Sequence, residues 1–300
     1  SGVAEGVFPG GVLLVRAAGR NVHLSAHGRC AIGPPAEAVR LDTCFDLASL
    51  TKVLAVVPAM LDLLARGRLT LGDRVAGWIP SFAGGQSDAV RVYHLLEHSS
   101  GLAAWRPYHE EVASARGGTL VATTAGRDAV RSLVAAEQPQ AEPGTRAVYS
   151  DLGFILLDWV IERAGEAPLD RLLQRRITRR MDGVDLFFID LKRPASARAA
   201  RRGRSFAATE RCPWRGHVLR GEVHDDNAWV MGGVSGHAGL FGNAQSVGRV
   251  AQSLLDSYAG RASLFDRELL RRFWRRSRVA GSTRALGFDT PAEQGSAAGG

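Results

Sequence analysis

The chain has 300 residues, 45% hydrophobic and 23% charged, which is enough for a large core and more than one folding unit. Its 38 basic and 30 acidic residues give a net charge of +8, yet the basic clusters are scattered and match no helix-turn-helix, RRM or zinc-finger pattern. Only Lys52 and Lys192 are lysines, so the excess reflects a preference for arginine, and no nucleic-acid partner is predicted.

Two further exclusions concern the membrane and the cysteines. No apolar run reaches the roughly 18 residues that a membrane span requires, which predicts a soluble chain. Cys30, Cys44 and Cys212 are odd in number and lack CxxC spacing, so neither a disulfide framework nor a zinc site is predicted. The sequence starts at Ser1 without methionine, so a signal peptide could have been removed, and cytoplasmic, periplasmic and secreted locations all stay open.

The N-terminal region predicts strands. Residues 10–17 and 21–27 are strand-like runs separated by a short turn, and we expect them to form a hairpin at the edge of an antiparallel sheet. A further short strand-like run, Phe45-Asp46-Leu47, leads into Ser49.

The first predicted helix follows at once. From Thr51 to Leu64 apolar residues recur at three- and four-residue steps, as on the buried face of a helix. Pro58 is expected to kink this helix or take up part of a turn, and Gly67 is expected to end it.

Helical patterns dominate the middle of the chain, with candidate helices at residues 73–79, 90–97, 128–136, 153–164 and 169–180. Residues 106–118 and 193–215 have no readable pattern and are predicted as loops. After residue 229 glycine becomes dense, and two more helices are predicted at 246–258 and 266–276.

This order predicts an α/β (α+β) fold, in which helices flank an antiparallel sheet and a mainly helical domain is inserted. The predicted domains are 1–66, the N-terminal part of the α/β domain with the first helix; 67–228, the mainly helical domain; and 229–300, the return to the α/β domain.

Ser49 and Lys52 form the first candidate site. A serine in the first turn of a helix lies near unpaired backbone N–H groups, which favour negative charge on a reacting oxygen. A lysine three residues later lies over the same helical face, and a buried neutral amine could take the serine proton and activate the nucleophile. The alternative is a serine cap beside a solvated lysine, since chance alone can supply this motif.

Tyr149 belongs to a second candidate site. The turn Pro143-Gly144 precedes it, and Asp151 follows at the start of an apolar helix, so a phenol and a carboxylate stand at the end of one loop. A tyrosine there could move a proton beside a cation, or it could cover the core with its hydroxyl at the surface.

His94-Leu95-Leu96-Glu97-His98 spells a third motif, the H-x-x-E-H of inverted zincins. Two histidines at i and i+4 on one helical face could hold zinc, with Glu97 as the base. No clearly placed third acidic ligand follows, and we expect the helix to end just after His98. Structural histidines at a helix end are the favoured interpretation.

The fourth candidate is the glycine-rich stretch from Met231 to Gly242. Its glycines are wrongly spaced for a dinucleotide loop, and His237 stands where a nucleophile elbow needs glycine. We therefore predict a close backbone approach beside a pocket, and no cofactor.

Taken together, three motifs resemble the serine β-lactamase-related superfamily, which includes class C β-lactamases, DD-peptidases and family VIII carboxylesterases. They are residues 45–52, 95–102 and the stretch from Pro143 to Asp151, and residues 223–241 are similar to the esterase-like branch in particular. The resemblance covers nearly the whole chain, in order, and implies a β-lactamase/transpeptidase-like fold.

The resemblance also implies roles. Ser49 would be the acylated nucleophile, Lys52 and Tyr149 would form the base, and the Ser49 backbone N–H would supply half of the oxyanion hole. Asp151 stands where the penicillin-binding branch has asparagine and cannot donate an amide hydrogen bond, which favours an esterase-like member. The substrates implied are small esters, amides or β-lactams. Oligomeric state stays open.

The family carries a third motif, Lys-Thr-Gly or His-Thr-Gly, on a strand beside the nucleophile. His237-Ala238-Gly239 is the nearest match, and it is predicted to lie in a glycine-rich loop followed by a helix. His237 and Gly239 are therefore candidate substrate-binding or supporting residues, or parts of a structural loop. We expect the closing strands to be absent after Leu286, so that the chain is a fragment or the second oxyanion donor comes from elsewhere.

The alternative function is a non-catalytic, penicillin-binding-like protein that keeps the pocket to bind a ligand. The pairing of lysine and tyrosine with the serine favours catalysis, because a binding protein needs neither. A zinc hydrolase built on His94, Glu97 and His98 is the less favoured third hypothesis.

Overall fold

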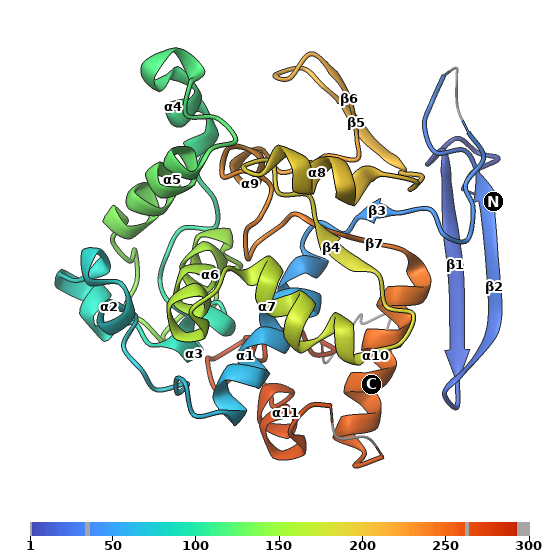
Figure 1. The fold of residues 1–300 in the computed structure, drawn as a ribbon. Helices are drawn as coiled ribbons and strands as arrows, with labels where there is room; N and C mark the ends of the chain where they lie inside the picture. Colours follow the sequence, from blue (N-terminus) through green and yellow to red (C-terminus); the bar gives the residue numbers. More distant parts are fainter. Residues whose placement is uncertain (1, 34–36, 262–263, 293–300) are drawn as a thin grey trace.

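The computed structural model describes residues 2–33, 37–261 and 264–292, and within these residues the strands form three separate antiparallel sheets. The pairs are β1 (Gly10–Ala17) with β2 (Arg20–Gly28), β7 (Leu240–Gly242) between β3 (Phe45–Asp46) and β4 (Leu186–Phe188), and β5 (Ala208–Cys212) with β6 (His217–Arg220). The predicted mixture of antiparallel strands and flanking helices is confirmed (Figure 1).

The β1–β2 hairpin is confirmed, but its predicted place at the edge of a larger sheet is wrong. In the described part of the chain no third strand pairs with it. β1 packs across the helix α10 (Ala244–Tyr258) instead, where Leu14 lies beside Gly248. A groove of about 580 Å³ therefore opens between the hairpin, β3 and α10, lined mainly by apolar residues.

The remaining helices are α1 (Val57–Ala65), α2 (Val75–Trp78), α3 (Val92–Leu96), α4 (Tyr108–Ser114), α5 (Thr124–Ala136), α6 (Asp151–Gly165), α7 (Leu169–Arg176), α8 (Pro194–Arg201), α9 (Asp226–Val230) and α11 (Arg267–Phe273). Figure 1 shows α2 to α5 on one side of the molecule and the β1–β2 hairpin on the other. No helix in the described ranges has both the length and the apolar character needed to cross a membrane. The three-domain division stays a prediction, and β4, from within residues 67–228, joins the sheet of β3 and β7.

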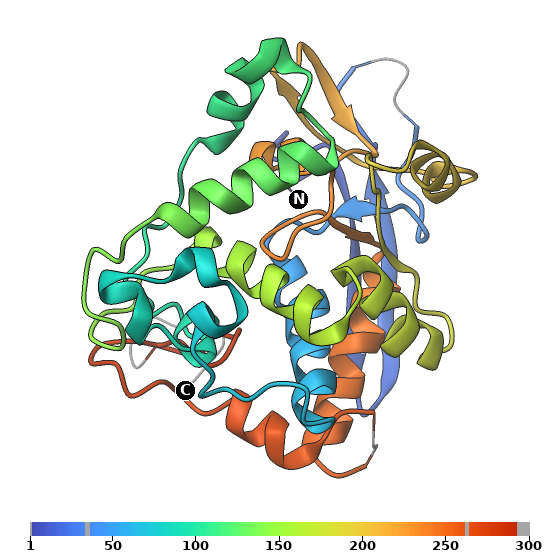
Figure 2. The same ribbon diagram turned by 60° about the vertical axis from the view of Figure 1, so that its left-hand side comes forward.

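The helix predicted from Thr51 begins as a π-helix. Residues Lys52–Val56 have π geometry, closed by the Val57 N–H donating to the Lys52 carbonyl, and α1 follows. Pro58 has no N–H to donate within the helix, and α-helical geometry starts immediately before it. α1 contacts α6, α7 and α11 and lies between them in the interior (Figure 2). Gly67 ends this region with φ +61°, as predicted.

Two predicted loops are wrong. Residues 106–118 contain α4, and residues 193–215 contain α8 and β5. In α8 only Ala197 is buried, so exposed arginines hide the helical period, although Pro194 occupies the first turn where proline is favoured. In the β5–β6 hairpin only Cys212 and Leu219 are buried, which is too little alternation to recognise from sequence.

The histidines of the H-x-x-E-H motif do not share a helical face. α3 ends at Leu96, earlier than predicted, and His98 has φ +59°. The Ser99 N–H donates to the His94 carbonyl and the His98 N–H to the Leu95 carbonyl, which is the bonding pattern of a Schellman helix end. Nδ1 of His94 accepts from the Arg91 N–H, and Nδ1 of His98 accepts from the Ser150 N–H. Both rings therefore use a nitrogen as an internal acceptor.

A first prediction concerns the buried ion pairs between α5 and α6. Arg131 Nη2 lies 3.0 Å from Asp158 Oδ2 and 2.9 Å from Glu162 Oε2, and both Arg131 and Asp158 are buried. Burial raises the pKa of Asp158, and the guanidinium opposes that shift. Arg131→Met leaves this carboxyl without its partner, so we expect the free energy of unfolding in urea to fall by about 3–5 kcal/mol.

The matched control is Arg68→Met, because Arg68 pairs with the exposed Glu166 at the surface. That change is expected to cost at most about 1 kcal/mol. Equal losses in the two variants would contradict the importance of the buried network.

A second prediction concerns pH. Burial lowers the pKa of His94 to about 4, below the value of about 6.5 for an unfolded chain. Between these values the unfolded chain binds a proton that the folded chain does not, so stability falls as the pH falls, by up to about 1.4 kcal/mol per pH unit. His94→Asn keeps an acceptor for the Arg91 N–H and removes the titration. Urea unfolding from pH 7 to pH 4.5 should then give a shallower dependence for the variant, and parallel curves would refute this account.

Candidate active site

Ser49 lies in a tight turn between β3 and the π-helix, and it is exposed. The preceding residue, Ala48, has φ +44°, in the left-handed region that residues other than glycine rarely adopt. Two side chains hold this turn: Asp46 Oδ1 accepts from the Ala48 N–H at 2.8 Å, and Thr51 Oγ1 donates to the Ala48 carbonyl at 2.6 Å. The strained backbone is therefore fixed on both sides of the serine.

The strand β7 fastens this turn to the rest of the protein. The Leu47 N–H donates to the Leu240 carbonyl at 2.9 Å, and the Leu240 N–H donates to Thr51 Oγ1 at 3.1 Å. The sequence predicts that the glycine-rich loop around His237 leads directly into a helix. This prediction is wrong, because β7 lies between Gly239 and α10. A fully buried strand of three residues shows no alternation that a sequence pattern could reveal.

Gly239, directly before β7, allows the chain to pass close to the backbone of Gly233. Its φ is +110°, and a Cβ added there would lie 2.6 Å from the Gly233 carbonyl oxygen. Only glycine fits this position without displacing backbone. The predicted close backbone approach in the glycine-rich stretch is confirmed here.

Lys52 is buried, with 3% of its surface exposed, and its ammonium contacts three oxygen acceptors. Nζ lies 3.2 Å from Ser49 Oγ, 2.7 Å from Asp151 Oδ1 and 2.9 Å from the carbonyl oxygen of His237. An ammonium has three protons, so these three acceptors satisfy it completely. The predicted reach of Lys52 to Ser49 is therefore present in the structure.

Tyr149 and Asp151 reach Lys52 from the start of α6. The Tyr149 ring centroid lies 4.9 Å from Lys52 Nζ, and the ring stacks at 4.5 Å on His98. Tyr149 is 37% exposed, so it lies along the lysine and remains open to solvent. The Val148 N–H donates to the His98 carbonyl at 2.8 Å, and Ser150 Oγ donates to the Ala103 carbonyl at 2.7 Å. The second and third sequence motifs thus pack together, as their family order implies.

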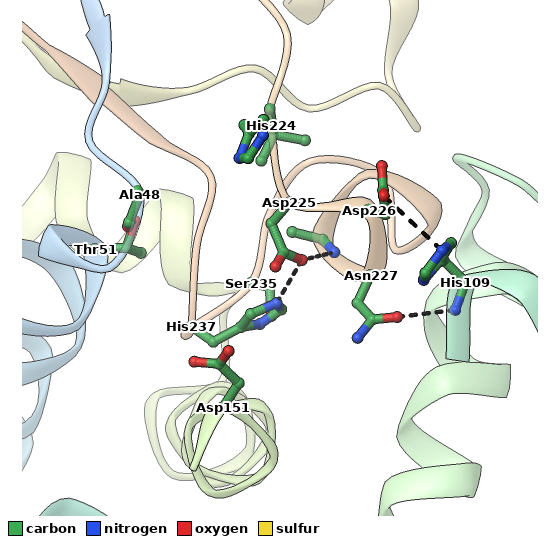
Figure 3. A network of polar contacts seen from close by, with 12 residues as sticks. Ala48, Thr51, His109, Asp151, His224, Asp225, Asp226, Asn227, Ser235 and His237 are labelled. Atoms are coloured by element: carbon green, nitrogen blue, oxygen red, sulfur yellow. Dashed lines mark hydrogen bonds and ion pairs between the residues drawn. The ribbon is translucent and has the colours of Figure 1, made fainter. Parts of the chain in front are cut away.

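The His237 ring points toward Asp225 (Figure 3). Nε2 lies 2.8 Å from Asp225 Oδ1, Nδ1 lies 2.8 Å from Ser235 Oγ, and the residue is 1% exposed. The backbone carbonyl of His237 accepts from Lys52, and the ring is closed to a ligand because both of its nitrogens have partners. Burial opposes the charged forms of His237 and Asp225, but their mutual attraction outweighs it. The pKa of His237 is raised, and that of Asp225 is held well below its usual range.

Several residues of this site escaped the sequence prediction. Asp46, Thr51, Asp225 and Ser235 all lie within motifs that the sequence reveals, but the sequence assigns none of them a role. The one local signal for Asp225 is its position before a short helix, where its Oδ1 accepts from the Ala228 N–H as a cap. Asp46 also accepts from the His224 N–H at 2.7 Å, and burial raises its pKa. Such long-range contacts leave no periodic pattern in the chain.

Of the aromatic residues Trp105, Tyr108, Trp214 and Trp229, three form a cluster with His109 and one belongs to the core. Tyr108 is buried and donates to Glu137, so it belongs to the core. Trp214 packs edge-on against Trp229 at 5.3 Å and against His109 at 4.9 Å, and Trp105 is 44% exposed nearby. Asn227 Oδ1 accepts from the His109 N–H, which joins this aromatic cluster to α9 (Figure 3). Across the described ranges, no group of three or more His, Cys, Asp or Glu residues is placed to hold a metal ion.

Comparisons with known proteins agree with this arrangement. A protein of Escherichia coli (strain K12), provisionally named a D-alanyl-D-alanine carboxypeptidase, is 32% identical over 244 residues, which are 77% of this chain and 55% of that protein. An N-acetylmuramyl-L-alanine amidase of Bacillus subtilis (strain 168) is 31% identical over 287 residues, 87% of this chain and 62% of that protein. The chain thus spans somewhat more than half the length of these curated relatives.

A penicillin-binding protein homologue from Pyrococcus abyssi has a similar solved structure, with a TM-score of 0.72 and 19% identity. The match covers 95% of this chain and 61% of that chain, and it shows the fold. The family model described as Beta-lactamase matches residues 1–299. With its fold, its ordered motifs and these relatives, the chain belongs to the β-lactamase family.

Proposed function

We propose that the protein is a serine hydrolase that acts through an acyl-enzyme on small esters or amides, with Ser49 as the nucleophile. The observation that carries this proposal is the contact of 3.2 Å between buried Lys52 Nζ and the Oγ of exposed Ser49. A substrate can reach the serine, while the basic group beside it is shielded from water. A solvated lysine, the alternative interpretation of the motif, would not be buried.

In the proposed first step Ser49 Oγ attacks the carbonyl carbon of the substrate, and its proton passes to Lys52 or Tyr149. The Ser49 backbone N–H donates to the oxyanion that forms. The leaving group takes up the proton and departs, and water then attacks the acyl-serine and restores the free enzyme. The proton taken from Ser49 thus leaves with the leaving group, and in the second step the attacking water gives its OH to the acyl carbon and its other proton, through the same base, to Ser49 Oγ.

Asp151 is proposed to hold a proton during this cycle. The ammonium form of Lys52 has no lone pair and cannot accept the serine proton until one of its own has left. Asp151 Oδ1, 2.7 Å from Nζ, is the carboxylate within reach. A carboxylate here replaces the amide donor of the penicillin-binding branch, and this difference favours esters over peptide substrates.

The names of the relatives point to a second substrate class. A carboxypeptidase and an amidase both cleave amide bonds, and these two relatives are at least 31% identical to this chain. We therefore propose a substrate range of small esters together with amides and β-lactams. A panel of p-nitrophenyl esters, D-alanyl-D-alanine peptides and β-lactams separates them by kcat/KM.

A third prediction tests the nucleophile and its base. A fluorophosphonate probe is expected to label the wild-type protein on the peptide containing Ser49, and Ser49→Ala should remove the labelling. Lys52→Met should slow it by about 10²–10⁴-fold, the usual worth of a positioned base. Intact mass and peptide mapping measure both effects.

Lys192→Met is the matched control, because Lys192 is the only other lysine and Asp190 keeps its ion pair with Arg193 in the variant. Its labelling rate should equal that of the wild type. An unlabelled wild-type protein would sink the hydrolase proposal, and non-covalent retention of a fluorescent penicillin would then identify a binding protein. Activity lost with a chelator but kept in Ser49→Ala would favour the zinc hypothesis.

A further inference from the structure

The direction of the Lys52 ammonium depends on the backbone of His237. Of its three acceptors, Ser49 Oγ and Asp151 Oδ1 belong to side chains, whereas the third is the His237 carbonyl at 2.9 Å. The orientation of this carbonyl is set by the loop between Gly233 and β7. Whatever fixes the His237 peptide also fixes one of the three hydrogen bonds of Lys52.

The His237 ring anchors that peptide. Both ring nitrogens have partners at 2.8 Å, Ser235 on one side and Asp225 on the other. Ser235, His237 and Asp225 have the connectivity of a Ser–His–Asp triad, but Ser235 is 0% exposed. No substrate can reach its hydroxyl, so this triad is not a second nucleophilic site.

Asp225 is itself held in place by α9. Its Oδ1 accepts from the Ala228 N–H at 2.7 Å as well as contacting His237 Nε2. In the same first turn of the helix, Asn227 Oδ1 accepts from the His109 N–H, and its Nδ2 donates to the Arg106 carbonyl. The first turn of this short helix is thus fixed to residues 106 and 109 and holds the carboxylate against the ring.

The charges around the pair favour its ionised form. Asp225 and Asp151 both favour the imidazolium of His237, and Lys52 opposes it. Burial disfavours both charges, but the contact between Asp225 and His237 outweighs it. A further carboxylate, Asp46, lies near Asp225 and His224. A buried ion pair with both ring nitrogens engaged leaves the ring one orientation.

We infer that Asp225 and His237 are positioning residues for Lys52, and that their buried pair directs the ammonium toward Ser49. The inference rests on the proposed function for its consequence in catalysis. It assigns neither residue a contact with substrate. Loss of the pair should free the loop and let the His237 carbonyl turn away from Nζ.

The experiment compares Asp225→Asn, His237→Ala and the double variant with Asp226→Asn as the matched control. Asparagine caps a helix as well as aspartate does, so Asp225→Asn removes the charge and keeps the α9 cap. Asp226 is its neighbour and lies against Arg215 and His109, not against His237. Thermal unfolding establishes that each variant is folded.

Lys52 can be observed directly, because Lys192 is the only other lysine in the chain. With isotope-labelled lysine, the Cε and Nζ resonances of Lys52 should shift in Asp225→Asn and in His237→Ala, and stay unchanged in Asp226→Asn. The His237 ring should titrate at a higher pH in the wild type than in Asp225→Asn. Neither readout requires enzymatic activity.

Fluorophosphonate labelling measures the consequence. Each single variant should label about 100-fold more slowly, the effect of misplacing a reacting group by about 1 Å. The double variant should be no slower than His237→Ala alone, because the two residues act as one unit. Asp226→Asn should label at the wild-type rate.

The outcomes separate the two proposals. Unchanged Lys52 resonances in a folded Asp225→Asn variant, or labelling at the wild-type rate, would overturn the inference. Independent losses that multiply in the double variant would also overturn it. If the Lys52 resonances shift in the two single variants but the wild-type protein is never labelled by the fluorophosphonate, the positioning role is supported and the hydrolase proposal is refuted.

Discussion

A single buried ammonium organises this structure. A charge removed from water is costly unless it is paired and hydrogen-bonded, and Lys52 meets that requirement with acceptors from three distant parts of the chain. Ser49 belongs to the turn before the π-helix, Asp151 to the first turn of α6, and His237 to the loop before β7. These three segments must meet for the lysine to be buried at all.

The neighbours of Lys52 extend this constraint outward. Asp151 follows Ser150 and Tyr149, which are held by the backbone and the ring of His98. His237 is held by Asp225, and Asp225 by α9. Much of the helical side of the molecule therefore contributes to the position of one amine, although only a few residues touch it.

The sequence predicts the parts of the site that depend on local geometry. Ser49 and Lys52 are three positions apart, which is close to one turn of a helix. Tyr149 stands just before a helix that the repeat of apolar residues predicts. The long helices α5, α6 and α10 are predicted for the same reason, since each repeats its buried face several times. The order of the motifs along the chain adds something that the spacing of apolar residues cannot. It indicates that residues 45–52, 95–102 and 143–151 belong to one site.

The remaining features depend on contacts between distant residues. β7 has three residues, too few to show alternation, and its identity as a strand depends on its partners β3 and β4. The pairing of Asp225 with His237 and the early end of α3 at Leu96 follow from packing, without a glycine or a repeated pattern to mark them. The hairpin β1–β2 is visible in sequence, but its position across α10 is not.

The link between Thr51 and Leu240 has a consequence for the order of events in folding. These residues are 189 positions apart, and their hydrogen bond closes the turn that presents Ser49. Closing so long a loop costs entropy that only later packing can offset. During synthesis, the turn that carries Ser49 leaves the ribosome early but cannot be locked until β7 has emerged and paired with β3. The turn that carries Ser49 therefore takes its final form only after a strand from much later in the chain has joined it.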